Sequence, residues 1–275
     1  MSRRLTAFCA SLVVIGGVAG AIWWQSAPVD PLAEVPADLP VPPFPPRITA
    51  GTAYETCLDT LARDPTGAMA LAESWQADGG GDGALHCRGL ALIALGKPAA
   101  GAELLEQVGR QSDAPGLARA SVLGQAVQAR LMVAQASEAM ADASQALGLS
   151  PSDSELFIMR ASAESMLGRL QDAVDDLSEA LRLDAARPDA LVLRAVMRRK
   201  LNQLDLAQAD ASQALALDPD DPDALLERGI LRQRMGDEAG ARADWEHARG
   251  VDPNSTTADL AEQNLSLLEV GPRQQ

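Results

Sequence analysis

The chain has few of the side chains on which most catalytic and metal sites depend. Its 275 residues include two histidines and three cysteines, and aromatic residues make up only 3% of the total. His86 and His247 are far apart in the sequence, and no Cys-x-x-Cys pair is present. Structural zinc sites gather roughly four such ligands at short spacings. We therefore expect no metal, no cofactor and no enzymatic activity.

The shortage of aromatic residues also bears on the fold class. Apolar residues form 47% of the chain, and alanine and leucine supply most of them. Strand-rich folds are enriched in Val, Ile, Tyr and Phe, whereas alanine and leucine suit close packing between helices. The composition therefore predicts an all-α fold.

Basic residues are outnumbered, because 38 acidic side chains face 23 lysines and arginines and the net charge is −15. A protein that binds phosphate backbones needs a sizeable basic surface. Nucleic acid is therefore excluded as a main partner.

The sequence does contain an internal repeat of 34 residues, which is clearest between residues 154 and 255. When the repeats are aligned, some equivalent positions carry arginine in every repeat, and others carry aspartate or alanine. Aligned examples are Arg160, Arg194 and Arg228; Asp176, Asp210 and Asp244; and Ala173, Ala207 and Ala241. A fixed period of this length is typical of stacked helical hairpins.

These columns resemble the tetratricopeptide repeat, whose pattern places small residues at its eighth, twentieth and twenty-seventh positions and a proline near its end. Ala161, Ala173 and Ala180 match the three small positions of one repeat, and Pro219 and Pro253 match the closing proline. The resemblance implies an α-solenoid of stacked helix-turn-helix hairpins. It also implies that the chain binds a protein or peptide.

The repeat divides the chain into segments, and its match weakens toward the N-terminus. Five tetratricopeptide repeats are expected over 82–255, after a degenerate N-terminal helical hairpin at 48–81. A C-terminal capping helix and tail are expected over 256–275.

The first residues are typical of a targeting segment. Arg3 and Arg4 precede an uncharged stretch over 5–24, and twenty helical residues span roughly 30 Å, about one hydrocarbon core. We expect 1–27 to be an uncleaved signal-anchor that attaches the chain to the membrane through residues 5–24. A cleaved signal peptide is the alternative, and both readings place the rest of the chain outside the cytoplasm.

A Pro-rich linker follows at 28–47, and it separates the targeting segment from the repeats. This segment has three interpretations: an extended polyproline stalk, a disordered linker, or a docking motif.

Two cysteines remain in the part that export would place outside, Cys57 and Cys87. An even number of cysteines in an oxidising compartment favours a disulfide, and both residues fall on predicted neighbouring helices. The alternative is a pair of buried thiols.

The recurring arginines and aspartates are interpreted as structural rather than catalytic. Stacked hairpins bring each arginine near an aspartate of its own or the preceding hairpin, where a bidentate pair would fix the register between helices. The expected ladder consists of Asp142, Arg160, Asp176, Arg194, Asp210, Arg228 and Asp244.

A partner-binding groove is expected on the first helices of the repeats at 188–255. Four apolar residues would form its floor and two cations its rim, as in grooves that receive a helix or an extended peptide. The candidates are Val192, Val196, Leu226 and Ile230 for the floor and Arg199 and Lys200 for the rim. The alternative is that the apolar four pack between hairpins.

Together these features predict a periplasmic tetratricopeptide scaffold, tethered to the inner membrane, that holds a protein or peptide partner in an envelope assembly. The alternative is an accessory subunit of a membrane-bound enzyme, of cytochrome-maturation machinery or of cell-wall machinery.

Overall fold

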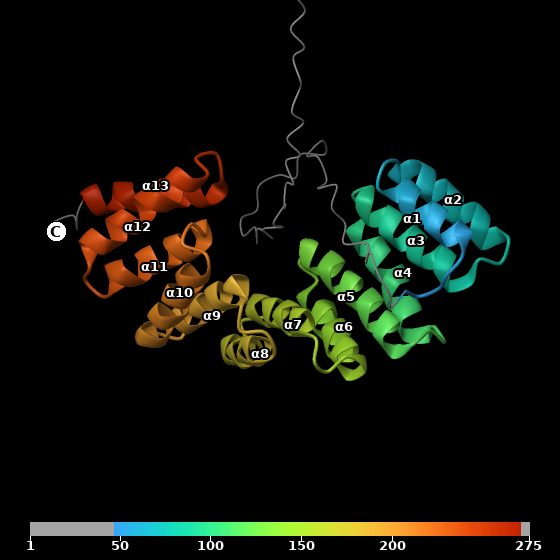
Figure 1. Cartoon of the computed structure of the whole chain (residues 1–275), viewed down its shortest axis with the longest axis horizontal. Coiled ribbons are helices and arrows are strands. Elements are labelled where there is room, and N and C mark those ends of the chain that lie inside the picture. Colours follow the sequence, from blue (N-terminus) through green and yellow to red (C-terminus); the bar gives the residue numbers. More distant parts are fainter. Residues whose placement is uncertain (1–46, 271–275) are drawn as a thin grey trace, which may run out of the picture. The chain divides into compact units, whose positions relative to one another are not determined.

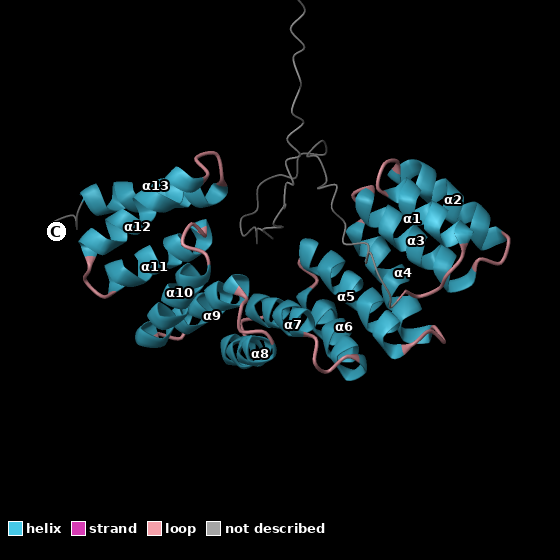
Figure 2. Ribbon diagram, in the orientation of Figure 1, coloured by secondary structure: helices cyan, strands magenta, loops and turns pink. Residues whose placement is uncertain are grey.

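The computed structural model describes residues 47–270, and this part of the chain contains thirteen helices and no strand (Figures 1 and 2). The helices are α1 (Thr52–Leu61), α2 (Pro65–Ala77), α3 (Gly81–Ala94), α4 (Pro98–Gln111), α5 (Gly116–Met132), α6 (Ala136–Leu149), α7 (Ser154–Met166), α8 (Leu170–Leu183), α9 (Pro188–Lys200), α10 (Leu204–Leu217), α11 (Pro222–Arg234), α12 (Glu238–Val251) and α13 (Thr256–Val270). The predicted all-α fold class is confirmed.

Each helix packs mainly against the helices that precede and follow it in the chain. The first helices of successive hairpins also touch, as α9 and α11 do, and α13 packs on both helices of the last hairpin. This nearest-neighbour pattern is the organisation of an α-solenoid. The structure therefore has the predicted stack of helical hairpins.

The predicted leader at 1–27 lies outside the described residues, as does nearly all of the linker at 28–47. No helix between residues 47 and 270 is long and apolar enough to cross a membrane.

Helix boundaries follow local chemistry. Proline occupies the first turn of α2, α4, α9 and α11, where its missing N–H costs no hydrogen bond. The Asp153 and Asp221 side chains accept hydrogen bonds from backbone N–H groups at the starts of α7 and α11.

The turn between the two helices of a hairpin requires a residue with positive φ. Gly168, Asn202 and Gly236 occupy this column with φ of 73°, 60° and 90°. The equivalent residue one repeat earlier is Ala134, with φ of 57°. An alanine in this left-handed region is strained, so this turn lacks the glycine or asparagine that relieves the strain in the next three hairpins.

The interior of the stack is built on the alanine columns. Ala161, Ala173 and Ala180 are 0–1% exposed, and leucines such as Leu177 and Leu191 fill the spaces between helices. Small side chains at these columns allow the two helices of a hairpin to approach closely. The columns that revealed the repeat in the sequence therefore mark its core.

Candidate partner-binding site

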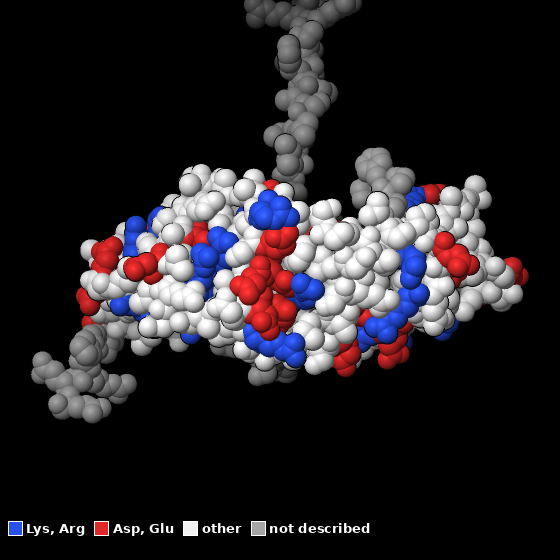
Figure 3. Space-filling view, turned by 90° about the horizontal axis from the view of Figure 1, so that it is seen from below, with Lys and Arg blue, Asp and Glu red and all other residues white. Residues whose placement is uncertain are grey.

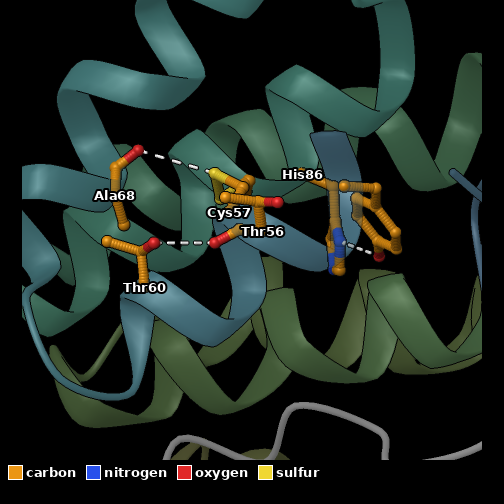
Figure 4. Close-up of a disulfide and its surroundings, with 7 residues drawn as sticks. Thr56, Cys57, Thr60, Ala68 and His86 are labelled. Carbon is orange, nitrogen blue, oxygen red and sulfur yellow. Dashed lines mark hydrogen bonds between the residues drawn. A yellow bond between two sulfur atoms is a disulfide. The ribbon is translucent and has the colours of Figure 1, made fainter. Parts of the chain in front are cut away.

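The N-terminal helices are joined by a disulfide between Cys57 on α1 and Cys87 on α3 (Figure 4). The two Cα atoms lie 6.3 Å apart, within the usual range for a bridge. Both side chains are almost fully buried, and they pack with Ala72 of α2. The bridge therefore fixes the helices whose sequences follow the repeat least closely.

Beside this bridge, His86 makes two buried hydrogen bonds that the sequence did not reveal. Its Nδ1 lies 2.7 Å from the Tyr54 hydroxyl of α1, and its Nε2 lies 2.7 Å from Gln125 Oε1 of α5. A neutral ring satisfies both bonds, because Nδ1 accepts from the hydroxyl and Nε2–H donates to the amide oxygen. Burial lowers the pKa of His86 to about 4, so the imidazole stays neutral and links α1, α3 and α5.

The three predicted arginines each bind the predicted aspartate of their own hairpin through two hydrogen bonds. Arg194 donates from Nε to Asp210 Oδ2 at 3.0 Å and from Nη2 to Oδ1 at 2.7 Å. Arg160 binds Asp176, and Arg228 binds Asp244, with the same pairs of atoms at 2.6–2.9 Å. These aspartates are 3–8% exposed. Each pair holds the two helices of one hairpin together.

The ladder also connects one hairpin to the hairpin before it. Arg194 Nη1 donates to Ser178 Oγ of α8 at 3.1 Å, and Arg160 Nη1 lies 3.5 Å from Ser144 Oγ of α6. The arginine therefore sets the position of its own hairpin on its neighbour.

Asp142 has a different partner, because the residue sixteen positions before it is Ala126 rather than an arginine. Arg130 of α5 donates from Nε to Asp142 Oδ2 at 2.7 Å, and Arg110 of α4 donates to Oδ1 at 3.2 Å. Glu106 binds both arginines and closes a four-residue network. Asp142 thus links the α5–α6 hairpin to α4.

A second arginine column, absent from the expected ladder, reaches the same aspartates. Arg198 and Arg232, four residues after Arg194 and Arg228, donate to Asp210 and Asp244 at 2.6 and 2.8 Å. Arg130 occupies the equivalent position in the α5–α6 hairpin. This column keeps the 34-residue spacing, except that residue 164 is Glu164.

The predicted groove residues do not all lie where a partner can reach them. Val192 is 9% exposed and belongs to the core, because α9 packs against its neighbours through this side chain. Val196, Leu226 and Ile230 are half-buried and pack against the edge of the same core. Val192 therefore belongs to the core rather than to the predicted floor, whereas Val196, Leu226 and Ile230 remain candidates for it.

The two rim cations also differ. Arg199 is half-buried and donates from Nε to Glu227 Oε1 of α11 at 2.6 Å, so its charge is already paired within the array. Lys200 is exposed at the end of α9. Of the two predicted rim cations, only Lys200 remains a candidate, because the ion pair between Arg199 and Glu227 joins α9 to α11.

No cluster of three histidine, cysteine, aspartate or glutamate side chains suited to a metal ion occurs among residues 47–270.

The fold defined by these hairpins is that of the tetratricopeptide-repeat solenoid, and solved structures share it. A thermophilic tetratricopeptide protein of Thermus thermophilus, TTC0263, aligns over 67% of this chain and 97% of its own, with 22% identity and a TM-score of 0.53. MamA of Desulfovibrio magneticus RS-1 (residues 41 to the end) aligns over 63% and 99%, with 15% identity and a TM-score of 0.55.

A third similar structure is YrrB, described as a tetratricopeptide protein with an unusual peptide-binding site. It aligns over 79% of this chain and 100% of its own, with 18% identity and a TM-score of 0.50. Neither a protein-family model nor a curated protein matches the sequence. At these identities the likeness establishes the fold.

Proposed function

We propose that this chain is a tetratricopeptide scaffold that holds a protein or peptide partner on the first helices of its C-terminal hairpins. The observation that carries the proposal is the pair Val196 and Ile230. They occupy equivalent positions on α9 and α11, two helices in contact, and both are half-buried. With Leu226 they offer an apolar strip beside the exposed Lys200. An apolar strip with a charged end gives a bound segment both affinity and orientation.

The strip can be tested directly, because the stack contains a polar residue at the same position. Ser162 of α7 is equivalent to Val196 and Ile230 and is also half-buried, so serine is compatible with the fold there. Changing both residues to serine is expected to weaken partner capture by about tenfold or more, since each lost apolar contact costs roughly 1 kcal/mol. Leu206→Ser, at a side chain on α10 that is 51% exposed, is the control and should leave capture unchanged.

The partner is identified by photo-crosslinking from positions 196 and 230, with position 206 as the control. Crosslinkers at both strip positions should form an adduct with the same partner. An added chain that carries the two serine substitutions should compete only poorly for that partner. Adducts that form equally from position 206, or their absence from both strip positions, would contradict a partner on this surface.

We further propose that the scaffold works in the periplasm, anchored in the inner membrane through residues 5–24. Two observations support this location: the basic and then apolar leader in the sequence, and the Cys57–Cys87 disulfide, since such bridges persist in oxidising compartments. The accessory-subunit alternative rests on the same leader and on the Pro-rich linker. Removing residues 1–47 distinguishes the scaffold from the accessory subunit. A scaffold that binds through the apolar strip keeps its partner, whereas a subunit that depends on the anchor loses it.

A further inference from the structure

The N-terminal end of the array carries a hollow between α1 and α2. Its volume is about 220 Å³, below the roughly 300–1,000 Å³ of pockets that enclose small-molecule ligands. The residues that line it are Thr52, Ala53, Thr56 and Cys57 of α1 and Leu71 and Trp75 of α2. Leu71 is 42% exposed, so an apolar side chain meets solvent here. The hollow therefore suits a short segment of chain rather than a small molecule.

Trp75 is held in a fixed position beside this hollow. A Cβ at Gly80 or at Gly83 would overlap the indole, so the ring lies directly over the glycines at the start of α3. The indole N–H has no hydrogen-bond partner among residues 47–270, and neither do the hydroxyls of Thr52 and Thr56. The hollow thus combines a preformed aromatic wall with donors that can bind backbone carbonyl oxygens. Grooves that receive polyproline segments are lined by aromatic side chains in the same way.

The hollow is also uncharged. No charged side chain is among the described residues that line it. Elsewhere, acidic and basic side chains are spread over much of the surface, as the face in Figure 3 shows. An occupant with ionised groups would lose hydration in the hollow without gaining a partner charge. The hollow therefore favours an uncharged segment.

The chain contains such a segment directly before the array. Residues 41–46 read Val-Pro-Pro-Phe-Pro-Pro, whereas residues 28–40 contain Asp30, Glu34 and Asp38. Tandem prolines favour the extended polyproline helix, the conformation that aromatic-lined grooves bind. Residues 41–46 are therefore the part of the linker whose chemistry matches the hollow.

The first described residues fix where this segment joins the array. Arg47 is ion-paired with Glu55 of α1, and Ile48 is buried in the core. Glu55 and Ala53 are about 200° apart around α1, so Arg47 and the hollow lie on opposite sides of that helix. Six residues of polyproline span about 19 Å, more than the helix diameter of about 10–12 Å, so the segment can pass the start of α1 and reach the hollow. Because the tether is short, the effective concentration of the segment is on the order of millimolar, and weak contacts suffice to hold it.

We propose that residues 41–46 bind in the hollow between α1 and α2 of their own chain. The proline rings pack against Trp75 and Leu71, and the indole N–H and the threonine hydroxyls donate to carbonyl oxygens of the segment. The bound segment covers the outer side of α1, which no hairpin precedes among residues 47–270, as α13 covers the other end of the array. Only residues 28–40 then separate the targeting segment from the array. The inference depends neither on the α9–α11 strip nor on the membrane anchor.

The test places a photo-crosslinking amino acid at residue 56 of the full chain, because Thr56 is exposed and lines the hollow. Residue 73 is the control position. Glu73 is exposed on α2, and it points away from the hollow because it is two residues from both Leu71 and Trp75. Mass spectrometry should find residue 56 joined to residues 41–46 and no such adduct from residue 73. A mixture of isotopically light and heavy chains should show that the adduct forms within one chain.

Two sets of four prolines provide matched variants, in which every proline of a set is replaced by serine. The segment set is Pro42, Pro43, Pro45 and Pro46, and the control set is Pro28, Pro31, Pro36 and Pro40. The segment set should lower the adduct yield from residue 56 by about tenfold or more, because a flexible chain fills the hollow only transiently. The control set should change that yield by less than about twofold, since residues 41–46 keep their prolines.

Fluorine spectra of chains labelled with 5-fluorotryptophan give a second measurement. The line of Trp75, assigned with Trp75→Phe, should shift in the segment set and stay in place in the control set. The line of Trp245, which is fully buried at the other end of the array, should stay in place in both sets.

Equal adduct yields from residues 56 and 73, or no adduct with residues 41–46, would overturn the binding of this segment. Adducts that form mainly between two chains, or equal effects of the two proline sets, would overturn it as well. Crosslinking of the partner from positions 196 and 230 does not involve the hollow, so failure of this inference is distinguishable from failure of the proposed function.

Discussion

His86 and Glu164 are both buried ionisable side chains, but burial lowers the pKa of His86 and raises the pKa of Glu164. The neutral imidazole of His86 has partners for both ring nitrogens, so burial favours its neutral form. Glu164 is buried next to the carboxylate of Asp176, so its own charge is disfavoured. Stability should therefore depend on pH through both residues, with opposite signs.

The pH dependence from His86 is a prediction at the residue scale. Its folded-state pKa, about 4, lies below the ordinary value of 6.5, so the unfolded chain binds more protons between these values. The free energy of unfolding should thus rise from pH 4 to pH 6.5, by about 3 kcal/mol if this group acts alone. Glu164 opposes this rise between about pH 4.5 and pH 6.5, so denaturant unfolding should reveal the rise as the difference between the unaltered chain and His86→Asn. An identical pH dependence in the two proteins would contradict the assignment.

Glu164 opposes this trend over part of the same range. Its folded-state pKa, about 7, lies above the ordinary 4.5, so its contribution is present below pH 4.5 and lost as pH rises through 7. The Glu164→Gln variant should consequently show a steeper rise than the unaltered chain, which separates the two residues.

The sequence predicted the residues of the ladder better than the residues beside it. Arg160, Arg194 and Arg228 recur at a fixed spacing from their aspartates, so hairpin stacking alone places them together. The column of Arg198 and Arg232 has the same period and was detectable, but Glu164 interrupts it. His86 left no such signal, because its partners come from α1 and α5, and no other repeat contains the arrangement.

At the scale of helices, the close approach within each hairpin depends on two facing positions sixteen residues apart. The pair is Ala161 with Leu177 in one hairpin and Ala195 with Ala211 in the next. In the last hairpin it is Gly229 with the fully buried Trp245, whose indole nitrogen donates to the Leu226 carbonyl at 3.2 Å. The glycine makes room for the indole, because a Cβ at residue 229 would overlap it.

This exchange of volume gives a prediction for the α11–α12 hairpin. Gly229→Ala should destabilise the array by about 1–3 kcal/mol, the usual cost of overpacking a core. Adding Trp245→Leu recreates the Ala161–Leu177 pair, so the double variant should lose at least about 1 kcal/mol less than the sum of the single losses. A thermodynamic cycle from urea unfolding measures this coupling.

Gly250→Ala is the control for the helix, because a Cβ there meets open space. It should raise stability by about 0.5–1 kcal/mol, as alanine is the better helix former. Additive losses at residues 229 and 245 would show that the two positions do not share one space.

The alanine and proline columns explain why the hairpins were predictable and the binding surface was not. Small buried residues recur wherever helices approach closely, so the repeat pattern describes packing directly. Exposure on the first helices depends on the adjacent hairpin, as the burial of Val192 and the pairing of Arg199 with Glu227 show. A single column in the sequence cannot distinguish a side chain that faces solvent from one that faces the next repeat.

Across the whole molecule, each hairpin is stabilised by its neighbours, so the ends of the array have the least support. The C-terminal end is covered by α13, whose Ala261 and Leu265 join the core of the last hairpins. At the N-terminal end, α1 and α2 follow the repeat poorly. They are held by the Cys57–Cys87 bridge and by the Tyr54–His86–Gln125 hydrogen bonds.

Reduction of the bridge should therefore act locally. Closing a loop with a sequence separation of 30 contributes about 3–4 kcal/mol in the chain-entropy estimate. Hydrogen exchange should quicken in α1, α2 and α3 after reduction, while amides of α9 to α12 keep their protection, because no contact of the bridge reaches them. A variant with both cysteines changed to alanine should show the same pattern and no further response to reductant. Exchange that quickens evenly along all thirteen helices would instead show that the array unfolds as one cooperative unit, and the bridge would then stabilise the C-terminal binding strip as much as the helices it joins.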